Sequence, residues 1–358
     1  MFTHGGNIEE LKEKFSPKIN NVLDFSSNLN PLNTPLKIRE TIKNNLKSIG
    51  GYPDIYSRRT RNFIARFHKV SEENILITNG SIEAIYFTAR LLSTKTSLIA
   101  LPTFSEYERA IKANRGMCRY VKTNPENDFN LNVEKIAKLI KKVHALWICN
   151  PNNPTSKVCS YDELLFLAKR ANVNNALFII DEAFIDFLPN PDKASLVKAL
   201  SDTRNILIIR SLTKFFTIAG LRVGYLIADK RLIKRLSNFS YPWAVNYFAQ
   251  ECAKCAFLDN RYINKSRGLI SKEKDFLYDK LCEFKELKVY YPYVNFILCR
   301  ILTQRINSHQ LFTKLAKKGI FIRDCSNFRG LNNQYFRLAI KTRKDNACIL
   351  GELKKILK

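Results

Sequence analysis

The chain has 358 residues, of which 46% are hydrophobic, so it can bury the core of one large unit or of two ordinary domains. Its net charge of +27 would suit a nucleic-acid partner, but the lysines are spread over helical faces, and the sequence has no zinc-finger, RNP or basic-zipper pattern. Since no apolar run reaches the roughly 18 residues of a membrane span and the start lacks a signal-peptide pattern, we expect a cytoplasmic protein without a nucleic-acid or membrane partner.

Residues 75–228 alternate short apolar runs with amphipathic stretches. The runs are continuous and rich in Val, Ile and Leu, which is typical of strands buried on both faces of a sheet. They are NILIT, TSLIALP, MCRYVKT, ALWICNP, ALFIIDEAF, NILIIRS and RVGYLIA. The pattern therefore predicts a mostly parallel, seven-stranded α/β sheet, whose ligands would bind at the carboxyl ends of the strands.

The pattern changes after residue 245. Helical stretches continue to about residue 285, and the strand candidates VYYPYVNFILCRI, GIFIRDC and YFRLAIKT follow. We predict a large domain at 36–245, and a smaller α+β domain that combines 246–358 with the N-terminal segment 1–35. The nine cysteines are irregularly spaced, and the lone pair Cys252 and Cys255 lies in a helical pattern, so we predict neither disulfides nor a metal site.

Polar residues follow most of the predicted strands. Each has an ordinary explanation by itself: a helix cap, a turn, a structural ion pair or a solvated lysine. In chain order, the motifs are Gly80-Ser81, Asn150-Pro151-Asn152-Asn153-Pro154-Thr155, Asp181-Glu182-Ala183-Phe184, Ser211-Leu212-Thr213-Lys214 and Gly220-Leu221-Arg222.

Together these motifs resemble the large domain of the fold-type I enzymes that depend on pyridoxal 5′-phosphate, the aspartate aminotransferase superfamily. The resemblance extends over nearly the whole chain and implies pyridoxal phosphate as the cofactor. It implies two catalytic residues. Lys214 would form the Schiff base with the cofactor aldehyde, and Asp181 would keep the pyridine nitrogen protonated so that the ring can withdraw electrons.

The resemblance also implies the other cofactor contacts. Asn153 would donate to the phenolic oxygen, and Phe104 would stack on the ring. The phosphate ligands would be Gly80, Ser81, Ser211, Arg222 and Tyr52. Tyr52, in GGYPDIY, would reach the cofactor of a neighbouring subunit, so we expect a homodimer with shared active sites. Phe184 stands where family members often have tyrosine. Phenylalanine cannot donate a hydrogen bond to the phenolic oxygen, so Asn153 would carry that role more by itself.

Two arginines narrow the expected substrate. Arg337, in YFRLAI, resembles the arginine that binds the substrate carboxylate, and Arg323, in GIFIRDCSNF, resembles one that meets a substrate phosphate in histidinol-phosphate aminotransferases. The stretches HGGN, DFSSNLNPL and GGYPDIY resemble threonine-phosphate decarboxylases of the cobalamin pathway. This resemblance implies that His4 and Asn28 lie on the substrate side, together with Asn153.

The expected reaction is the decarboxylation of L-threonine O-3-phosphate to (R)-1-aminopropan-2-yl phosphate and CO₂, in cobalamin biosynthesis. Two alternatives stay open: a histidinol-phosphate-type aminotransferase, and an O-phosphoserine decarboxylase that forms ethanolamine phosphate. Transamination and decarboxylation share every cofactor contact and differ in which bond of the α-carbon stands perpendicular to the ring. A non-catalytic basic binding protein on the same fold is disfavoured by the intact set of lysine, aspartate and asparagine.

Overall fold

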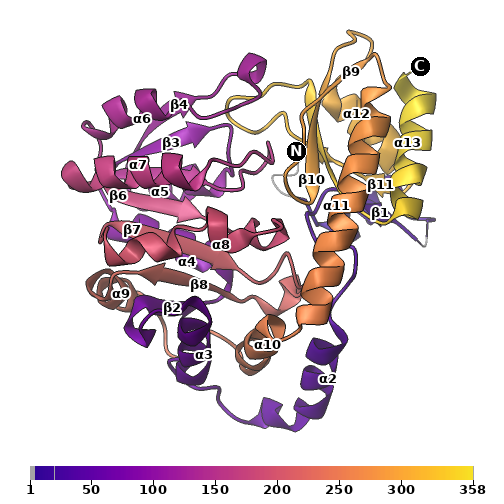
Figure 1. The fold of residues 1–358 in the computed structure, drawn as a ribbon. Coiled ribbons are helices and arrows are strands. Elements are labelled where there is room, and N and C mark those ends of the chain that lie inside the picture. Colours follow the sequence, from indigo (N-terminus) through magenta and orange to yellow (C-terminus); the bar gives the residue numbers. More distant parts are fainter. Residues whose placement is uncertain (1–4, 20, 358) are drawn as a thin grey trace.

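In the computed structural model, residues 5–19 and 21–357 are described. A seven-stranded sheet occupies one side of the molecule, and a four-stranded and a two-stranded sheet occupy the other (Figure 1). All seven predicted strands are present in the large sheet, in the order β2-β8-β7-β6-β5-β3-β4. They are β2 (Ile75–Thr78), β3 (Thr96–Leu101), β4 (Met117–Lys122), β5 (Ala145–Cys149), β6 (Leu177–Asp181), β7 (Ile206–Ser211) and β8 (Gly224–Ala228).

The large sheet is mostly parallel, as predicted. Within it, β8 runs antiparallel to both of its neighbours, and the other neighbouring pairs are parallel. Strands β3, β5 and β7 are buried at every position, because helices cover both faces of the sheet. One face packs on α4 (Gly80–Leu91), α5 (Glu106–Ala113) and α9 (Lys230–Ser237), and the other on α3 (Arg58–His68), α6 (Val133–Ile140) and α7 (Tyr161–Val173).

The strands after residue 285 form the four-stranded antiparallel sheet β12-β13-β10-β9. A further strand, β11, pairs in parallel with β1 near the N-terminus. The bounds are β1 (Leu23–Asp24), β9 (Leu287–Val289), β10 (Phe296–Ile301), β11 (Ile320–Phe321), β12 (Arg323–Asp324) and β13 (Tyr335–Ala339). The run VYYPYVNFILCRI was expected to be one strand, but only its first residue, Val289, lies in β9, and β10 begins at Phe296. The connection between them contains Pro292, which cannot donate to a ladder.

Helices connect and cover these sheets. Helix α10 packs against α2 and α3, and the long α11 packs against β9 and α13. The bounds not yet given are α1 (Ile8–Phe15), α2 (Leu36–Asn44), α8 (Pro191–Ala194), α10 (Tyr247–Phe257), α11 (Asn260–Cys282), α12 (Ser308–Ala316) and α13 (Arg343–Leu357). The domain boundaries near residues 35 and 245 stay a prediction. Across the described residues, no helix combines the length and apolarity that crossing a bilayer requires.

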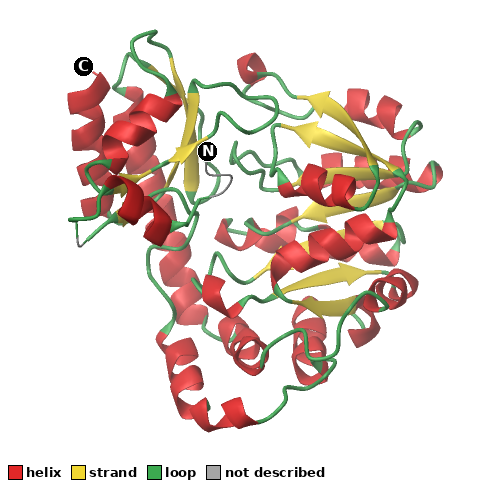
Figure 2. Ribbon diagram, turned by 180° about the vertical axis from the view of Figure 1, so that it is seen from behind, coloured by secondary structure: helices red, strands yellow, loops and turns green. Residues whose placement is uncertain are grey.

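The carboxyl ends of the parallel strands face the four-stranded sheet (Figure 2). Residues that follow the strands therefore meet residues from the last part of the chain. This arrangement positions the candidate active site between the two larger sheets.

Candidate active site

A cavity of about 560 Å³ lies at the carboxyl ends of the parallel strands. Its walls come from the large sheet, from the four-stranded sheet and from the N-terminal segment. Nine of the residues expected from the sequence line it: Asn28, Ser81, Phe104, Asn153, Asp181, Lys214, Arg222, Arg323 and Arg337. The structure thus brings together residues that are more than 300 positions apart in the sequence.

Lys214 lies in the turn that follows β7. Its Nζ donates a hydrogen bond to Thr213 Oγ1 at 3.2 Å. Burial and the nearby positive charges of Arg222 and Arg337 together lower the pKa of the Lys214 amine to about 8, against the opposing effect of Asp181. A larger fraction of this amine is therefore unprotonated near neutral pH than for an ordinary lysine, and the free lone pair makes it a nucleophile.

Asp181 ends β6 at the deep side of the cavity, where it is 4% exposed. The Tyr107 hydroxyl donates to Asp181 Oδ2 at 2.6 Å, and the Ala183 N–H donates to Oδ1 at 2.9 Å. Burial raises the pKa of Asp181, and these two hydrogen bonds oppose the rise. A buried carboxylate held in this way suits a cationic partner such as a protonated ring nitrogen.

An anion-binding corner is formed where α4 begins. Gly80 has a φ of +77°, and a Cβ atom there would come within 2.6 Å of Arg222 Nη2, so glycine allows the guanidinium to approach the helix start. The cap residue Asn79 forms no side-chain bond to the first turn. The unpaired N–H groups, the helix dipole and the guanidinium together suit a phosphate group.

Arg337 lies on β13 and is 5% exposed. It donates to Asn153 Oδ1 through Nη1 and to the Ser26 carbonyl through Nη2 at 2.6 Å, while its Nε has no hydrogen-bond partner among the described residues. Burial lowers the pKa of Arg337 to about 10. A buried guanidinium that bonds neutral oxygens in this way would form stronger, charge-assisted hydrogen bonds with a carboxylate ligand.

Arg323 lies on β12, the strand next to β13, and is 6% exposed. It donates to the Asp324 carbonyl and to Asn327 Oδ1, the latter at 2.8 Å, and its guanidinium lies 4.9 Å from the centre of the Phe328 ring. Burial lowers its pKa. Two buried arginines on neighbouring strands make this side of the cavity suitable for a ligand with two anionic groups.

Ser211 and Tyr52, which were also expected in the site, do not line the cavity. Ser211 is 1% exposed and does not line the cavity, and its hydroxyl bonds Thr213 Oγ1 at 2.8 Å. Tyr52 is 83% exposed and packs on Trp243, outside the cavity of its own chain. His4 lies outside the described residues. The cofactor and substrate roles of all these residues stay predictions.

Three contacts in the site were not expected from the sequence. Tyr107, which holds Asp181, lies in the first turn of α5, and its ring packs edge-on against Phe104 with ring centroids 5.8 Å apart. Thr213 lies between Ser211 and Lys214. The Ser26 carbonyl reaches Arg337 because Asp24 Oδ1 accepts from the Ser26 N–H at 2.8 Å. This local turn is typical of the Asp-x-Ser spacing.

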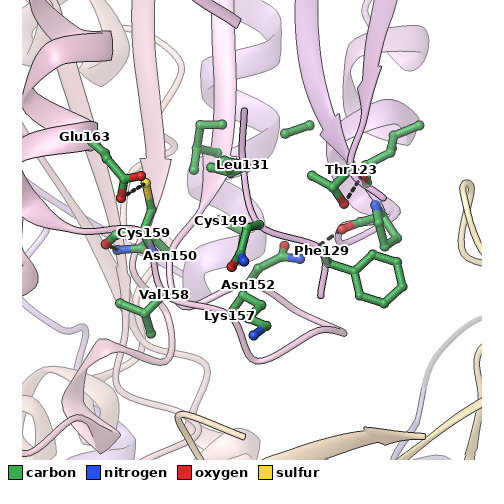
Figure 3. A pocket seen from close by; sticks show the side chains of 15 residues that line it. Thr123, Phe129, Leu131, Cys149, Asn150, Asn152, Lys157, Val158, Cys159 and Glu163 are labelled. Carbon is green, nitrogen blue, oxygen red and sulfur yellow. Dashed lines mark hydrogen bonds between the residues drawn. The ribbon is translucent and has the colours of Figure 1, made fainter. Parts of the chain in front are cut away.

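A smaller cavity of about 90 Å³ adjoins the large one and shares Cys149 with it (Figure 3). Two amide side chains of the loop that follows β5 line it, Asn150 and Asn152. Asn150 Oδ1 accepts from the Cys159 N–H at 2.8 Å, and Asn152 Nδ2 donates to the Pro102 carbonyl at 2.9 Å. These bonds hold the loop that presents Asn153 to the active site.

The comparisons with known proteins agree with this geometry. A family model described as aminotransferase class I and II matches residues 20–352. Threonine-phosphate decarboxylase of Salmonella typhimurium is 33% identical over 355 residues, which cover 99% of this chain and 96% of that protein. The crystal structure of histidinol-phosphate aminotransferase from Clostridium acetobutylicum matches with 32% identity and a TM-score of 0.88, over 94% of this chain and 99% of the other.

The crystal structure of L-threonine-O-3-phosphate decarboxylase from Porphyromonas gingivalis matches with 25% identity and a TM-score of 0.84, over 94% of this chain and 99% of the other. The fold is therefore the aspartate aminotransferase-like, fold-type I architecture, as predicted. The chain belongs to the aminotransferase class I and II family. Within that family it is similar both to threonine-phosphate decarboxylases and to histidinol-phosphate aminotransferases.

Proposed function

We propose that this chain is a pyridoxal-phosphate-dependent lyase that removes CO₂ from L-threonine O-3-phosphate and releases (R)-1-aminopropan-2-yl phosphate. The observation that carries the proposal is one cavity that joins Lys214 and Asp181 to two buried arginines on neighbouring strands. The similarity to threonine-phosphate decarboxylases over almost the whole chain supports the same reaction. By the same resemblance, we place the reaction in cobalamin biosynthesis.

The residues of the large sheet fit the cofactor. Lys214 would supply the amine for its aldehyde, Asp181 would pair with its ring nitrogen, and the corner between Gly80 and Arg222 would hold its phosphate. Bound pyridoxal phosphate supplies an electron sink that weakens the bonds of the substrate α-carbon. The Tyr107 hydroxyl and the Ala183 N–H keep the Asp181 carboxylate in place for the ring nitrogen.

The arginines of the four-stranded sheet fit the substrate. L-threonine O-3-phosphate carries a carboxylate and a phosphate, and the cavity offers Arg337 and Arg323 as separate cationic partners for them. Binding both anions fixes the α-carbon between them, so binding energy far from the reacting bond can orient that bond. Asn28 lines the same cavity, and its buried Oδ1 has no hydrogen-bond partner in the described part of the chain, so it can accept a hydrogen bond from the substrate.

A histidinol-phosphate-type aminotransferase is the second candidate, favoured by the likeness to the Clostridium acetobutylicum structure. Histidinol phosphate has a phosphate but no carboxylate, so it would use Arg323 and leave Arg337 for a second, oxo-acid substrate. The test is to incubate the cofactor-loaded enzyme with phosphothreonine alone, or with histidinol phosphate and 2-oxoglutarate. We expect CO₂ only from the first mixture. Glutamate formed in the second mixture, without CO₂ from the first, would establish the aminotransferase instead.

O-phosphoserine belongs in the same comparison, because it lacks one methyl group of phosphothreonine. A methyl group in an apolar pocket gives about 1–3 kcal/mol of discrimination. We therefore expect phosphoserine to be decarboxylated more slowly than phosphothreonine. A higher kcat/KM for phosphoserine would identify the product as ethanolamine phosphate.

We also propose that the enzyme is a cytoplasmic homodimer. Tyr52 is 83% exposed, and its ring lies 4.9 Å from that of Trp243, which is itself 46% exposed. Ile49 and Tyr241, which are near them in the sequence, are also exposed. A group of exposed apolar side chains suits a protein interface. In such a dimer, Tyr52 would bind the cofactor phosphate of the other subunit.

A further inference from the structure

The turn that carries Lys214 is bonded to a segment almost 200 residues earlier in the chain, residues 30–34. The Asn30 N–H donates to the Lys214 carbonyl at 3.1 Å. Thr217 Oγ1 donates to the Asn30 carbonyl at 3.0 Å, and Thr34 Oγ1 donates to the Thr217 carbonyl at 2.7 Å. The backbone of the turn is therefore fixed from outside the large sheet.

The Asn30 side chain adds a second set of bonds. It is 2% exposed, and its Nδ2 donates to the Phe215 carbonyl at 2.9 Å and to Ser266 Oγ on α11 at 2.8 Å. Its Oδ1 accepts from the Leu32 N–H at 3.1 Å. One buried amide thus joins the N-terminal segment, the Lys214 turn and the long helix. Removing it would leave buried carbonyl and hydroxyl groups with fewer partners, which is costly in a dry environment.

The position of this turn controls the environment of the Lys214 amine. The pKa of that amine is lowered by burial and by the charge of Arg222, and both effects depend on where the backbone of the turn lies. Ser26, whose carbonyl accepts from Arg337, lies four residues before Asn30 in the same N-terminal segment. The substrate side and the lysine are therefore attached to the same short stretch of chain.

We propose that Asn30 is a positioning residue for Lys214, which acts by fixing the backbone of the turn from the N-terminal segment and α11. The proposal rests on the proposed role of Lys214 as the cofactor-binding amine. Asn30 does not line the cavity, so it acts through the lysine turn and does not touch the reacting atoms.

The test measures the titration of Lys214 in the full-length chain without cofactor. A lysine amine is acylated only as the free base, so its labelling rate rises with pH and levels off above its pKa. Trace labelling with acetic anhydride, read for Lys214 by peptide mass spectrometry, should give a midpoint of about 8 in the wild type. In Asn30→Ala, the loosened turn admits water, and the midpoint should rise toward the ordinary lysine value of about 10.4.

Asn346→Ala is the matched control. Asn346 is also a fully buried amide, and its Nδ2 donates to Glu273 Oε2 at 3.1 Å and to the Lys341 carbonyl at 2.9 Å. It lies outside the active-site cavity, so its loss should lower stability and leave the Lys214 midpoint unchanged. An unchanged midpoint in Asn30→Ala, or an equal shift in Asn346→Ala, would overturn the proposal.

Tyr262→Phe keeps the test decisive if Asn30→Ala does not fold. The Tyr262 hydroxyl shares its one proton between the Asn33 carbonyl at 2.7 Å and the Phe215 carbonyl at 3.2 Å, so its removal loosens the same turn from α11. We expect a smaller rise of the Lys214 midpoint in this variant, and no rise would contradict the proposal. The proposed cofactor role is judged separately, by borohydride reduction of the loaded wild-type enzyme, and fails if the cofactor is found on another lysine.

Discussion

The two halves of the cavity are built differently. The proposed cofactor half consists of residues at the ends of buried parallel strands, where Asp181 ends β6 and Lys214 follows β7. The substrate half comes from the N-terminal segment and from the short strands β12 and β13 near the C-terminus. One half is therefore set by the core of a single sheet, whereas the other depends on how distant parts of the chain meet.

The hydrogen bonds of the two halves also differ. In the cofactor half, Tyr107 holds Asp181 and can remain in place when the cofactor binds. In the substrate half, the arginines bond neutral oxygens, including Asn153 Oδ1 at Arg337 and Asn327 Oδ1 at Arg323. Substrate anions compete with those oxygens for the guanidinium groups. Loss of Lys214 from the cofactor half should thus abolish turnover of every substrate, and loss of Arg323 from the substrate half should act mainly on phosphorylated substrates.

The largest effect is expected at Lys214. Lys214→Ala removes the amine for the cofactor aldehyde, so covalent attachment and nearly all turnover should be lost. Borohydride reduction of the wild-type enzyme followed by peptide mapping should place the cofactor on Lys214, and the variant should carry no label. A label on a different lysine would show that Lys214 is not the residue that binds the cofactor.

Asp181→Asn tests the electron sink. The variant keeps a side chain of the same size but cannot stabilise a protonated ring nitrogen, so kcat should fall about 100- to 1,000-fold, as for other lost transition-state charges. Tyr107→Phe, which removes one hydrogen bond to Asp181, should lower kcat by less. Steady-state kinetics with saturating cofactor make the comparison, and near-normal turnover of Asp181→Asn would refute the assigned role.

Arg323→Ala tests the substrate half. Loss of a charge-assisted contact to the substrate phosphate in a partly dry site should cost about 2–4 kcal/mol in kcat/KM with phosphothreonine. The same change should matter far less with unphosphorylated L-threonine, because that substrate never uses the contact. The comparison therefore requires kcat/KM for both substrates.

Arg329→Ala is the control for that experiment. Arg329 lies in the loop after β12, but its guanidinium is paired with Glu108 at 2.8 and 2.9 Å and does not line the active-site cavity. It should change the two substrates equally and only slightly. If Arg323→Ala also weakens both substrates equally, Arg323 is structural and the phosphate site lies elsewhere.

A smaller change in activity is expected from hybrid dimers that combine two different variants. Lys214→Ala and Tyr52→Phe chains each damage the site, but an exchanged hybrid has one site in which both residues are intact if Tyr52 acts across the interface. Mixing the two variants should raise activity above that of either parent. A protein that stays monomeric at working concentrations, or a mixture no more active than its parents, would contradict the shared site.

The sequence predicted the cofactor half better than the substrate half for a physical reason. Continuous apolar runs mark buried parallel strands, and the polar residues that follow them, such as Asp181, must share one edge of the sheet. The bond from Arg337 to the Ser26 carbonyl joins positions 311 residues apart, and no local pattern encodes it. The run GIFIRDC likewise divides between β11 and β12 in different sheets, which depends on long-range pairing.

The most direct test of the account follows the substrate carboxyl carbon. L-threonine O-3-phosphate labelled with ¹³C at the carboxyl group is incubated with the cofactor-loaded enzyme and no oxo acid, and the products are observed by NMR. The account predicts that the label leaves as CO₂ and bicarbonate, together with an equal amount of aminopropan-2-yl phosphate. A parallel incubation contains 2-oxoglutarate as an amino-group acceptor. Label retained in a 2-oxo acid there, with no labelled CO₂ in either incubation, would contradict the account.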